Sequence, residues 1–331
     1  MSLNIGRISE TKPLRQVKEM ERRFLYALVE DGRASLTQIA RKAHLSKDAA
    51  HYLLTNLQKK GILTHIAPIV DLQKFGYQTY HAFFVTNDEQ KERKATFLDY
   101  LALHPHTKAV MEYTSRWEVE WTLVAENMQQ FDQLLTQLTT KFPEVILEKS
   151  KLAIIKGYKS TTVAARYVPP PKKARLYLPD KQDQAILQQL HEDGRRSSYA
   201  MAQKVHLSAN AVRYRIKKMV QADIIRFFTA TVNLNALGYH LYTVGFILKS
   251  LSSSQEAKLK EFLNQERFII RAVKVLGSWD VLITILADDL KHFHETVKKI
   301  VDTFSDIIIS YEALIAYEER VYKYIPSVVL Q

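Results

Sequence analysis

The feature that most constrains this chain is an internal repeat in which equivalent residues lie 162 positions apart. The tetrapeptide Glu-Asp-Gly-Arg at residues 30–33 returns at residues 192–195, and Trp117 returns as Trp279. A register kept without gaps over about a hundred residues indicates a duplicated unit. At 331 residues, the chain is long enough for each unit to contain two domains.

Positive charge is concentrated in one part of each unit. The chain has 47 basic and 35 acidic residues, which give a net charge of +12. Residues 1–60 and 164–226 carry net charges of +6 and +8, whereas residues 61–163 and 227–331 each carry −1. This separation indicates two modules that contact a polyanion and two that do not.

The basic part of each unit has the pattern of three short helices. In the first copy, apolar spacing predicts helices over residues 17–31 and 36–43, followed by a third helix that Ser46 caps. A tight turn before the third helix is typical of a helix-turn-helix. Histidine tolerates a positive φ better than most residues, so we expect His44 and His206 to form these turns rather than to bind metal.

The third helix of the second copy, residues 208–219, has an amphipathic pattern. Val212, Ile216 and Met219 form an apolar stripe, whereas Asn210 and Arg213 fall on a different face. Arginine and asparagine can pair with base edges, and lysine meets phosphate, so this face has the chemistry of a DNA contact. The alternative is an ordinary solvated charged face. The candidate DNA-binding residues are Ser208, Asn210, Arg213, Tyr214, Arg215, Lys217 and Lys218, with Lys47, His51, Lys59 and Lys60 in the first copy.

The corresponding face in the first copy has lost its cations. At the offset of 162, Asn210, Arg213 and Lys217 correspond to the residues Asp48, His51 and Thr55. An acid at this position repels phosphate. We therefore expect the first helix-turn-helix to make a weaker or backbone-only DNA contact, and the alternative is that it has become a structural domain.

The neutral part of each unit has a second recurring pattern. Between residues 77 and 155, strand and helix signals alternate in the order β-α-β-β-α-β, and the same order recurs between residues 241 and 316. This is the order of a ferredoxin-like domain, so the predicted fold class is α+β, with two winged-helix-like domains alternating with two ferredoxin-like domains. The predicted segments are a polar leader (1–16), a helix-turn-helix domain (17–62), a ferredoxin-like domain (63–163), a proline-rich basic linker (164–179), and the second pair of domains (180–225 and 226–331).

These motifs together resemble the Lrp/AsnC, or feast/famine, transcription regulators. The second copy carries the resemblance best, through Asp180-x-x-Asp183, the tetrapeptide at 192–195, and the capped helix after Leu207. The turn Gly277-Ser278-Trp279-Asp280 resembles the glycine-aromatic-aspartate turn of the family's ligand-sensing (RAM) domain. The resemblance implies binding to double-stranded DNA, effectors of the amino-acid class near that turn, and self-association through the ferredoxin-like domains.

The duplication modifies what the resemblance implies. Ordinary family members are about half this length and dimerise, so we expect the two ferredoxin-like domains to form an intramolecular pseudo-dimer, a larger oligomer, or both. The first copy has Ser115-Arg116-Trp117-Glu118 in place of the glycine turn, which makes an effector site there doubtful. We favour core packing over ligand contact for Trp117 and Trp279.

Several classes of function lack support in the sequence. The chain has no cysteine, so disulfides and thiolate chemistry are excluded, and we expect no metal, cofactor or catalytic group. We expect a cytoplasmic, nucleoid-associated protein. Siroheme decarboxylases share the two-module plan. The first helix-turn-helix unit, whose polar face has lost its cations, keeps that enzymatic alternative open together with Tyr113, Arg116 and Trp117. A non-specific architectural DNA-binding protein is the other alternative.

Overall fold

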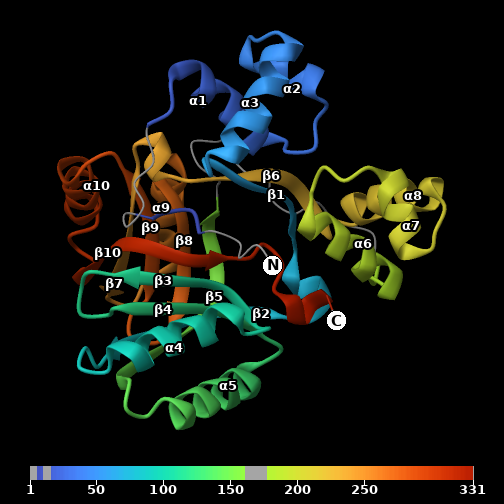
Figure 1. Cartoon of the computed structure of the whole chain (residues 1–331). Coiled ribbons are helices and arrows are strands. Elements are labelled where there is room, and N and C mark those ends of the chain that lie inside the picture. The colour runs from blue at the N-terminus through green and yellow to red at the C-terminus, as the bar shows by residue number, and fades with distance from the viewer. Residues whose placement is uncertain (1–5, 10–15, 161–176, 331) are drawn as a thin grey trace.

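The duplicated unit is visible directly in the structure. The computed structural model describes residues 6–9, 16–160 and 177–330. Most of the predicted linker, residues 164–179, lies outside these residues. Two helical domains project from one large sheet domain, each to a different side (Figure 1). Among the described helices, none has the length and apolar character required to cross a membrane.

Each helical domain contains the three predicted helices. Ser46 and Ser208 cap the third helices through their hydroxyls, which accept hydrogen bonds from backbone amides three residues later. His44 and His206 have φ angles of 56° and 54°, so the predicted left-handed turns are confirmed. The helices are α1 (Glu19–Glu30), α2 (Leu36–Ala43), α3 (Lys47–Lys59), α6 (Lys181–Glu192), α7 (Ser198–Val205) and α8 (Ala209–Gln221).

A two-stranded antiparallel ribbon connects the helical domains to the rest of the molecule. It pairs β1 (Leu63–Val70) with β6 (Ile225–Val232), one strand from each unit. Each helical domain packs on the strand of the other unit. The Gly32 amide donates to the Phe228 carbonyl at 2.9 Å, and the Gly194 amide donates to the Ile66 carbonyl at 2.8 Å. Both helical domains are therefore in contact with the same ribbon.

Both ferredoxin-like domains have the predicted order of elements, confirming the fold class. In the first unit the elements are β2 (Gln78–Thr86), α4 (Lys91–Leu103), β3 (Thr107–Tyr113), β4 (Val119–Ala125), α5 (Met128–Lys141) and β5 (Ile146–Ser160). In the second they are β7 (His240–Leu248), α9 (Ser253–Gln265), β8 (Ile269–Leu276), β9 (Val281–Ala287), α10 (Leu290–Thr303) and β10 (Ile308–Tyr322). Short 3-10 helices occupy Leu72–Phe75 (η1), Asn235–Leu237 (η2) and Ser327–Leu330 (η3).

The two sheets join edge to edge and close on themselves. The strand order is β10-β3-β4-β2-β5-β8-β9-β7, in which β5–β8 and β10–β3 are pairs between the units. The expected intramolecular pseudo-dimer is therefore present. Helices α4 and α5 lie on the outer face of the first sheet, and α9 and α10 on that of the second (Figure 1). Closure leaves a shared interior between the units.

Two strands are longer than their local sequence pattern predicts. The predicted strand ends were residues 155 and 316, whereas β5 continues to Ser160 and β10 continues to Tyr322. The added residues pair with the other unit, with Ser160 opposite Arg271 and Tyr322 opposite Ala109. Pairing partners that are distant in sequence leave no local periodicity, which is why these extensions were missed.

The described part of the predicted polar leader is not peripheral. Ile8 is only 1% exposed and belongs to the core inside the closed sheet. Ser9 forms a bridge with Glu318 of β10. Residues 6–9 therefore belong to the sheet domain, in contrast to the predicted separate leader. Inside the same core the rings of Phe83 and Trp279 meet edge to face, with centroids 5.1 Å apart.

Candidate nucleic-acid interface and central cavity

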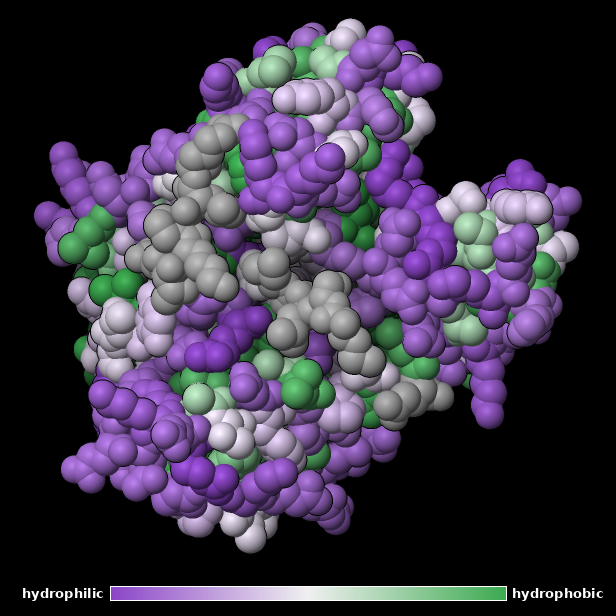
Figure 2. All heavy atoms as spheres, viewed as in Figure 1, coloured by the Kyte–Doolittle hydropathy of each residue, from purple (hydrophilic) through white to green (hydrophobic). Residues whose placement is uncertain are grey.

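Helix α8 presents the predicted polar face to solvent. Val212, Ile216 and Met219 are buried against the second helical domain, as expected from their spacing. The exposed side chains of the helix include Asn210, Arg213, Tyr214, Lys217 and Lys218. Hydrophilic side chains cover much of the surface of both helical domains in the view of Figure 2.

The exposed residues of α8 are arranged in different ways. Arg213 Nη2 donates to Asn210 Oδ1 at 2.6 Å, so these two side chains hold each other on the surface. The Lys218 ammonium lies 4.2 Å from the centre of the Tyr177 ring, a cation–π contact. Lys217 has neither a hydrogen bond nor an ion pair to any other described residue. Asn210, Arg213 and Lys217 therefore form one accessible polar group.

Arg215 differs from the other candidate residues on α8. Its Nη1 donates to Asp180 at 2.8 Å and to Asp183 at 3.0 Å, and its Nη2 donates to Gln182 at 2.6 Å. The side chain of Asp183 is fully buried. Arg215 thus anchors α8 to the start of α6, a role that sequence spacing did not predict.

The first helical domain exposes a different set of residues. Lys47, His51, Lys59 and Lys60 are all exposed, but Lys47 lies at the start of α3 and the other two lysines lie at its end. Asp48 lies in the first turn of α3, where it complements the helix dipole. The middle of this helix therefore has no cation comparable with Arg213 or Lys217.

The predicted effector turn packs between the two units. Gly277 has a φ of 149°, and a side chain there would collide with the Lys151 carbonyl of β5. The Ser278 hydroxyl hydrogen-bonds to the Ser150 hydroxyl at 2.7 Å, and Asp280 Oδ2 accepts from the Leu248 amide at 2.8 Å. Trp279 is 4% exposed. The polar groups of this turn are thus engaged within the chain.

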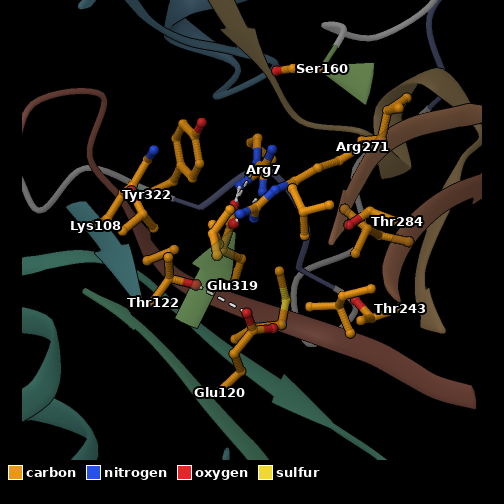
Figure 3. Close-up of a pocket in the computed structure, with 18 of the residues that line it drawn as sticks. Arg7, Lys108, Glu120, Thr122, Ser160, Thr243, Arg271, Thr284, Glu319 and Tyr322 are labelled. Atoms are coloured by element: carbon orange, nitrogen blue, oxygen red, sulfur yellow. Dashed lines mark hydrogen bonds and ion pairs between the residues drawn. The ribbon is translucent and has the colours of Figure 1, made fainter. Parts of the chain in front are cut away.

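A cavity that the sequence did not reveal lies inside the closed sheet. This central cavity has a volume of about 290 Å³ and is lined by both units. Its polar lining includes Arg7, Thr79, Lys108, Tyr113, Glu120, Thr122, Lys159, Ser160, Thr243, Arg271, Thr284, Glu319 and Tyr322. In Figure 3, Arg271 extends from β8 toward Arg7 and Glu319, and Lys108 reaches in from β3.

A polar network fixes one wall of the central cavity. Arg271 Nη2 lies 2.9 Å from His81 Nε2, and His81 Nδ1 lies 2.5 Å from Glu120. Since arginine can only donate, His81 Nε2 accepts and the ring proton sits on Nδ1, facing Glu120. Burial and the charge of Arg271 lower the pKa of His81, consistent with this neutral form. Tyr113 also donates to Glu120.

The two carboxylates of the central cavity both accept hydrogen bonds from neighbouring groups. Burial acts to raise the pKa of Glu120, but the bonds from His81 and Tyr113 hold it at about 2. Glu319 accepts from the Arg7 amide at 2.5 Å, from its Nε at 3.0 Å, and from its Nη2 at 2.7 Å. Burial disfavours the charge on Arg7, yet its pKa is raised because Glu319 outweighs that effect.

Lys108 contributes a further charge to the cavity. Burial, together with the positive charges of Arg271 and Arg7, lowers its pKa to about 8. No group of three or more potential metal ligands occurs among the described residues.

Family models match both helical domains. An AsnC-type helix-turn-helix domain matches residues 180–220, and a winged helix-turn-helix DNA-binding model matches residues 15–64. The AsnC-type match thus falls on the helix-turn-helix whose polar face is intact. Two matches in one chain agree with the duplicated arrangement.

Two curated relatives and one solved structure extend the comparison. A leucine-responsive regulatory protein of Rhizobium meliloti (strain 1021) is 33% identical over 121 residues, 36% of this chain and 76% of that protein. An HTH-type transcriptional regulator of Mycobacterium tuberculosis (strain ATCC 25618 / H37Rv), Rv2324, is 29% identical over 121 residues, 37% of this chain and 81% of that protein.

The solved structure matches nearly the whole chain. The siroheme decarboxylase NirDL superposes with a TM-score of 0.63 at 12% identity, over 93% of this chain and 94% of that chain. At this identity the likeness concerns the fold alone. The family models and the 33% identical relative establish that this chain belongs to the Lrp/AsnC family of DNA-binding transcription regulators, with the family's two-domain unit present twice.

Proposed function

We propose that this chain regulates transcription by binding promoter DNA mainly through α8 of the second helix-turn-helix. The observation that carries the proposal is the accessible group of Asn210, Arg213 and Lys217 on a capped, well-packed helix. Asparagine and arginine can read base edges in the major groove, and lysine can neutralise phosphate. Arg215 is left out of the contact set because Asp180 and Asp183 occupy it.

The first helix-turn-helix makes a secondary contact in this proposal. The ribbon of β1 and β6 joins both helical domains, so DNA bound to α8 lies within reach of a linked second module. Lys47, Lys59 and Lys60 are exposed and suit phosphate contacts, whereas Asp48 opposes a groove contact by α3. The two modules would then contribute unequally to affinity.

The test is a titration of DNA binding by a charge-removal variant. Replacing Arg213 and Lys217 with alanine should weaken binding to a promoter fragment selected by the wild-type chain. The slope of log affinity against log salt should flatten by about two for the two lost cations. The control is Lys258→Ala with Lys298→Ala, which removes the same charge from exposed positions of α9 and α10. Equal weakening by both variants would contradict a role for α8.

A comparison of DNA sequences separates regulation from DNA packaging. A regulator should bind its selected fragment about 10³-fold or more tightly than random DNA, whereas an architectural protein should bind both alike. The Arg213 and Lys217 variant should lose this preference as well as affinity. Retained preference would place sequence reading elsewhere in the chain.

A tetrapyrrole enzyme is the second candidate function. The observation that favours it is the similarity of fold to the siroheme decarboxylase over 93% of this chain. The central cavity, at about 290 Å³, lies at the small end of ligand sites, which range over roughly 300–1,000 Å³, and this size favours a smaller molecule. Adding siroheme and recording the absorbance spectrum tests the candidate, because a bound macrocycle should shift its absorption bands.

In this proposal the regulator also responds to an effector of the amino-acid class. The interior of a pseudo-dimer is a suitable location, because a ligand held there contacts both units at once. The turn of residues 277–280 is less suitable, since Ser278 and Asp280 are engaged with neighbouring residues.

A further inference from the structure

We propose that the central cavity binds a small metabolite bearing a carboxylate or phosphate group, that Lys108 and Arg271 hold this oxyanion, and that its binding adjusts the affinity for DNA. This inference rests on the proposed function, since it supplies the regulator with an effector site and an effector chemistry. The site differs from the predicted effector turn and uses two cations whose equivalents in the other unit are the uncharged residues Ile270 and Ala109.

Both carboxylates of the central cavity already accept hydrogen bonds from neighbouring side chains. Glu319 accepts three hydrogen bonds from Arg7, and Glu120 accepts from His81, Tyr113 and Thr122. Each carboxylate thus has its negative charge satisfied by groups that are fixed in place. Neither carboxylate hydrogen-bonds to Lys108 or Arg271; Glu120 faces Arg271 through His81, whereas Lys108 has no such link to either carboxylate among the described residues.

Two cations in the cavity have unused donors. Within the described residues, the Lys108 ammonium makes no hydrogen bond or ion pair. The Arg271 guanidinium makes one hydrogen bond, to His81, which leaves other N–H groups of its planar fork available. Burial and the repulsion from Arg271 and Arg7 lower the pKa of Lys108. A buried charge without a partner is costly, and an anion placed between Lys108 and Arg271 would remove that cost.

The remaining lining indicates the kind of anion. The guanidinium fork matches the geometry of carboxylate and phosphate oxygens, and the ammonium group supplies a point charge. Hydroxyl groups of Thr243, Thr284 and Tyr322 also face the cavity and can hydrogen-bond to a polar ligand. The volume of about 290 Å³ suits a compact molecule. Within the amino-acid class, an acidic amino acid fits this chemistry.

A second cavity provides a route from the ligand to the DNA-binding helix. This side cavity, of about 150 Å³, shares Lys108 and Tyr322 with the central cavity and is also lined by Arg226 of β6. Arg226 pairs with Asp223 at 3.8 Å, in the turn that directly follows α8. A ligand that draws the Lys108 ammonium toward the central cavity reduces the positive charge next to Arg226. In this proposal the resulting shift of Arg226 reaches α8 through β6 and the Arg226–Asp223 pair.

The test measures thermal stability and DNA affinity of the full chain with defined probes. The probes are L-glutamate, succinate and inorganic phosphate, with succinamide, the uncharged diamide of succinate, as the control that lacks an oxyanion. At least one anion should raise the melting temperature of the wild-type chain and change its DNA affinity. Lys108→Met should lower the affinity for that anion by about tenfold or more, because a hydrogen bond to a charged group is lost. Arg271→Lys keeps the positive charge but removes the planar guanidinium donors. It should also lower the affinity for that anion.

The outcomes are distinguishable. Stabilisation by glutamate or succinate assigns a carboxylate ligand, and stabilisation by phosphate alone assigns a phosphorylated one. The control variant Lys258→Met with Lys298→Met, which removes exposed lysines from α9 and α10, should respond to anions as the wild type does. If no anion stabilises the chain, or if Lys108→Met retains full affinity, the inference is overturned while DNA binding through α8 stands. If an anion binds but DNA does not, the proposed function fails instead.

Discussion

Arg33 and Arg195, which are equivalent residues of the two units, each donate hydrogen bonds to the backbone carbonyls that flank the other. Arg33 Nη2 donates to the Arg196 carbonyl at 3.0 Å, and its Nη1 donates to the Gly194 carbonyl. In return, Arg195 Nη1 donates to the carbonyls of Gly32 at 2.7 Å and Ala34 at 2.9 Å. The repeated Glu-Asp-Gly-Arg segment, the clearest sign of duplication in the sequence, therefore builds a clasp between the helical domains.

Removing the clasp should destabilise the arrangement of the two helical domains. Arg33→Ala leaves the carbonyls of Gly194 and Arg196 without their charged donor, which should cost about 1–3 kcal/mol. Thermal or urea unfolding measures the loss. Arg41→Ala, which removes an exposed cation from α2, is the control and should change stability little.

A double variant tests whether the two arginines act together. If Arg33 and Arg195 support one shared interface, then the loss in the double alanine variant should differ from the sum of the two single losses. Strict additivity would indicate two independent contacts. The same unfolding measurement on the four chains gives the answer.

Arg215 should act on stability rather than on DNA recognition. Arg215→Ala removes one of the donors to Asp183, whose side chain is fully buried, and the loss should destabilise the second helical domain by about 1–3 kcal/mol. Hydrogen exchange of the α8 amides measures this local effect. Lys217→Ala is the matched comparison, because it removes an exposed cation from the same helix and should reduce DNA affinity while leaving amide protection unchanged.

Local patterns in the sequence predicted the helical domains well. Ser46 and Ser208 cap their helices as expected, and His44 and His206 adopt the expected left-handed conformation. These features depend on neighbours within a few residues, which a single sequence displays directly. The role of Arg215 was missed because Asp180 lies 35 residues away.

The central cavity depends on contacts that the sequence does not display. At the offset of 162, Lys108 corresponds to Ile270, and Arg271 corresponds to Ala109, so comparison of the two units does not pair these cations. Arg7 lies in a segment whose polarity predicted a leader. The one local signal was a charged residue within a strand, as at Lys108 of β3, but edge and solvent-facing positions give the same signal.

Lys108 should make the free protein more stable as the pH rises from about 8. Its pKa is lowered from an ordinary 10.5 to about 8, so between these values the unfolded chain binds more protons than the folded chain. Stability from this group therefore increases with pH across that window. The charged and titratable groups that line the two cavities with it are Arg7, Tyr113, Glu120, Lys159, Arg226, Arg271, Glu319, Tyr322 and Tyr324, and His81 lies next to Arg271 and Glu120.

Replacing Lys108 separates its contribution from that of its neighbours. Without added anion, Lys108→Met should be more stable than the wild type at pH 7 by about 2 kcal/mol, because a poorly solvated charge is removed. The difference should shrink toward pH 10. Urea unfolding at several pH values measures it. A less stable variant at pH 7 would show that Lys108 already has a compensating partner.

Three substitutions should give the first helix-turn-helix the polar face of the second. Asp48→Asn, His51→Arg and Thr55→Lys together reproduce the polar face of α8 on α3, where all three positions are exposed. DNA affinity should rise, and the salt dependence of log affinity should steepen by about two, because two cations are gained. A gel-shift titration at several salt concentrations measures both quantities.

The chain offers a chemically matched control for this gain of function. Asp302→Asn, His294→Arg and Thr303→Lys make the same three replacements at exposed positions on α10, away from both helical domains. The control raises the net charge equally, so it reports any effect of charge alone. If the α3 variant binds DNA more tightly than the α10 variant, then the first domain still lies where DNA can reach it. If the two variants bind alike, then α3 faces away from DNA and the first domain is structural.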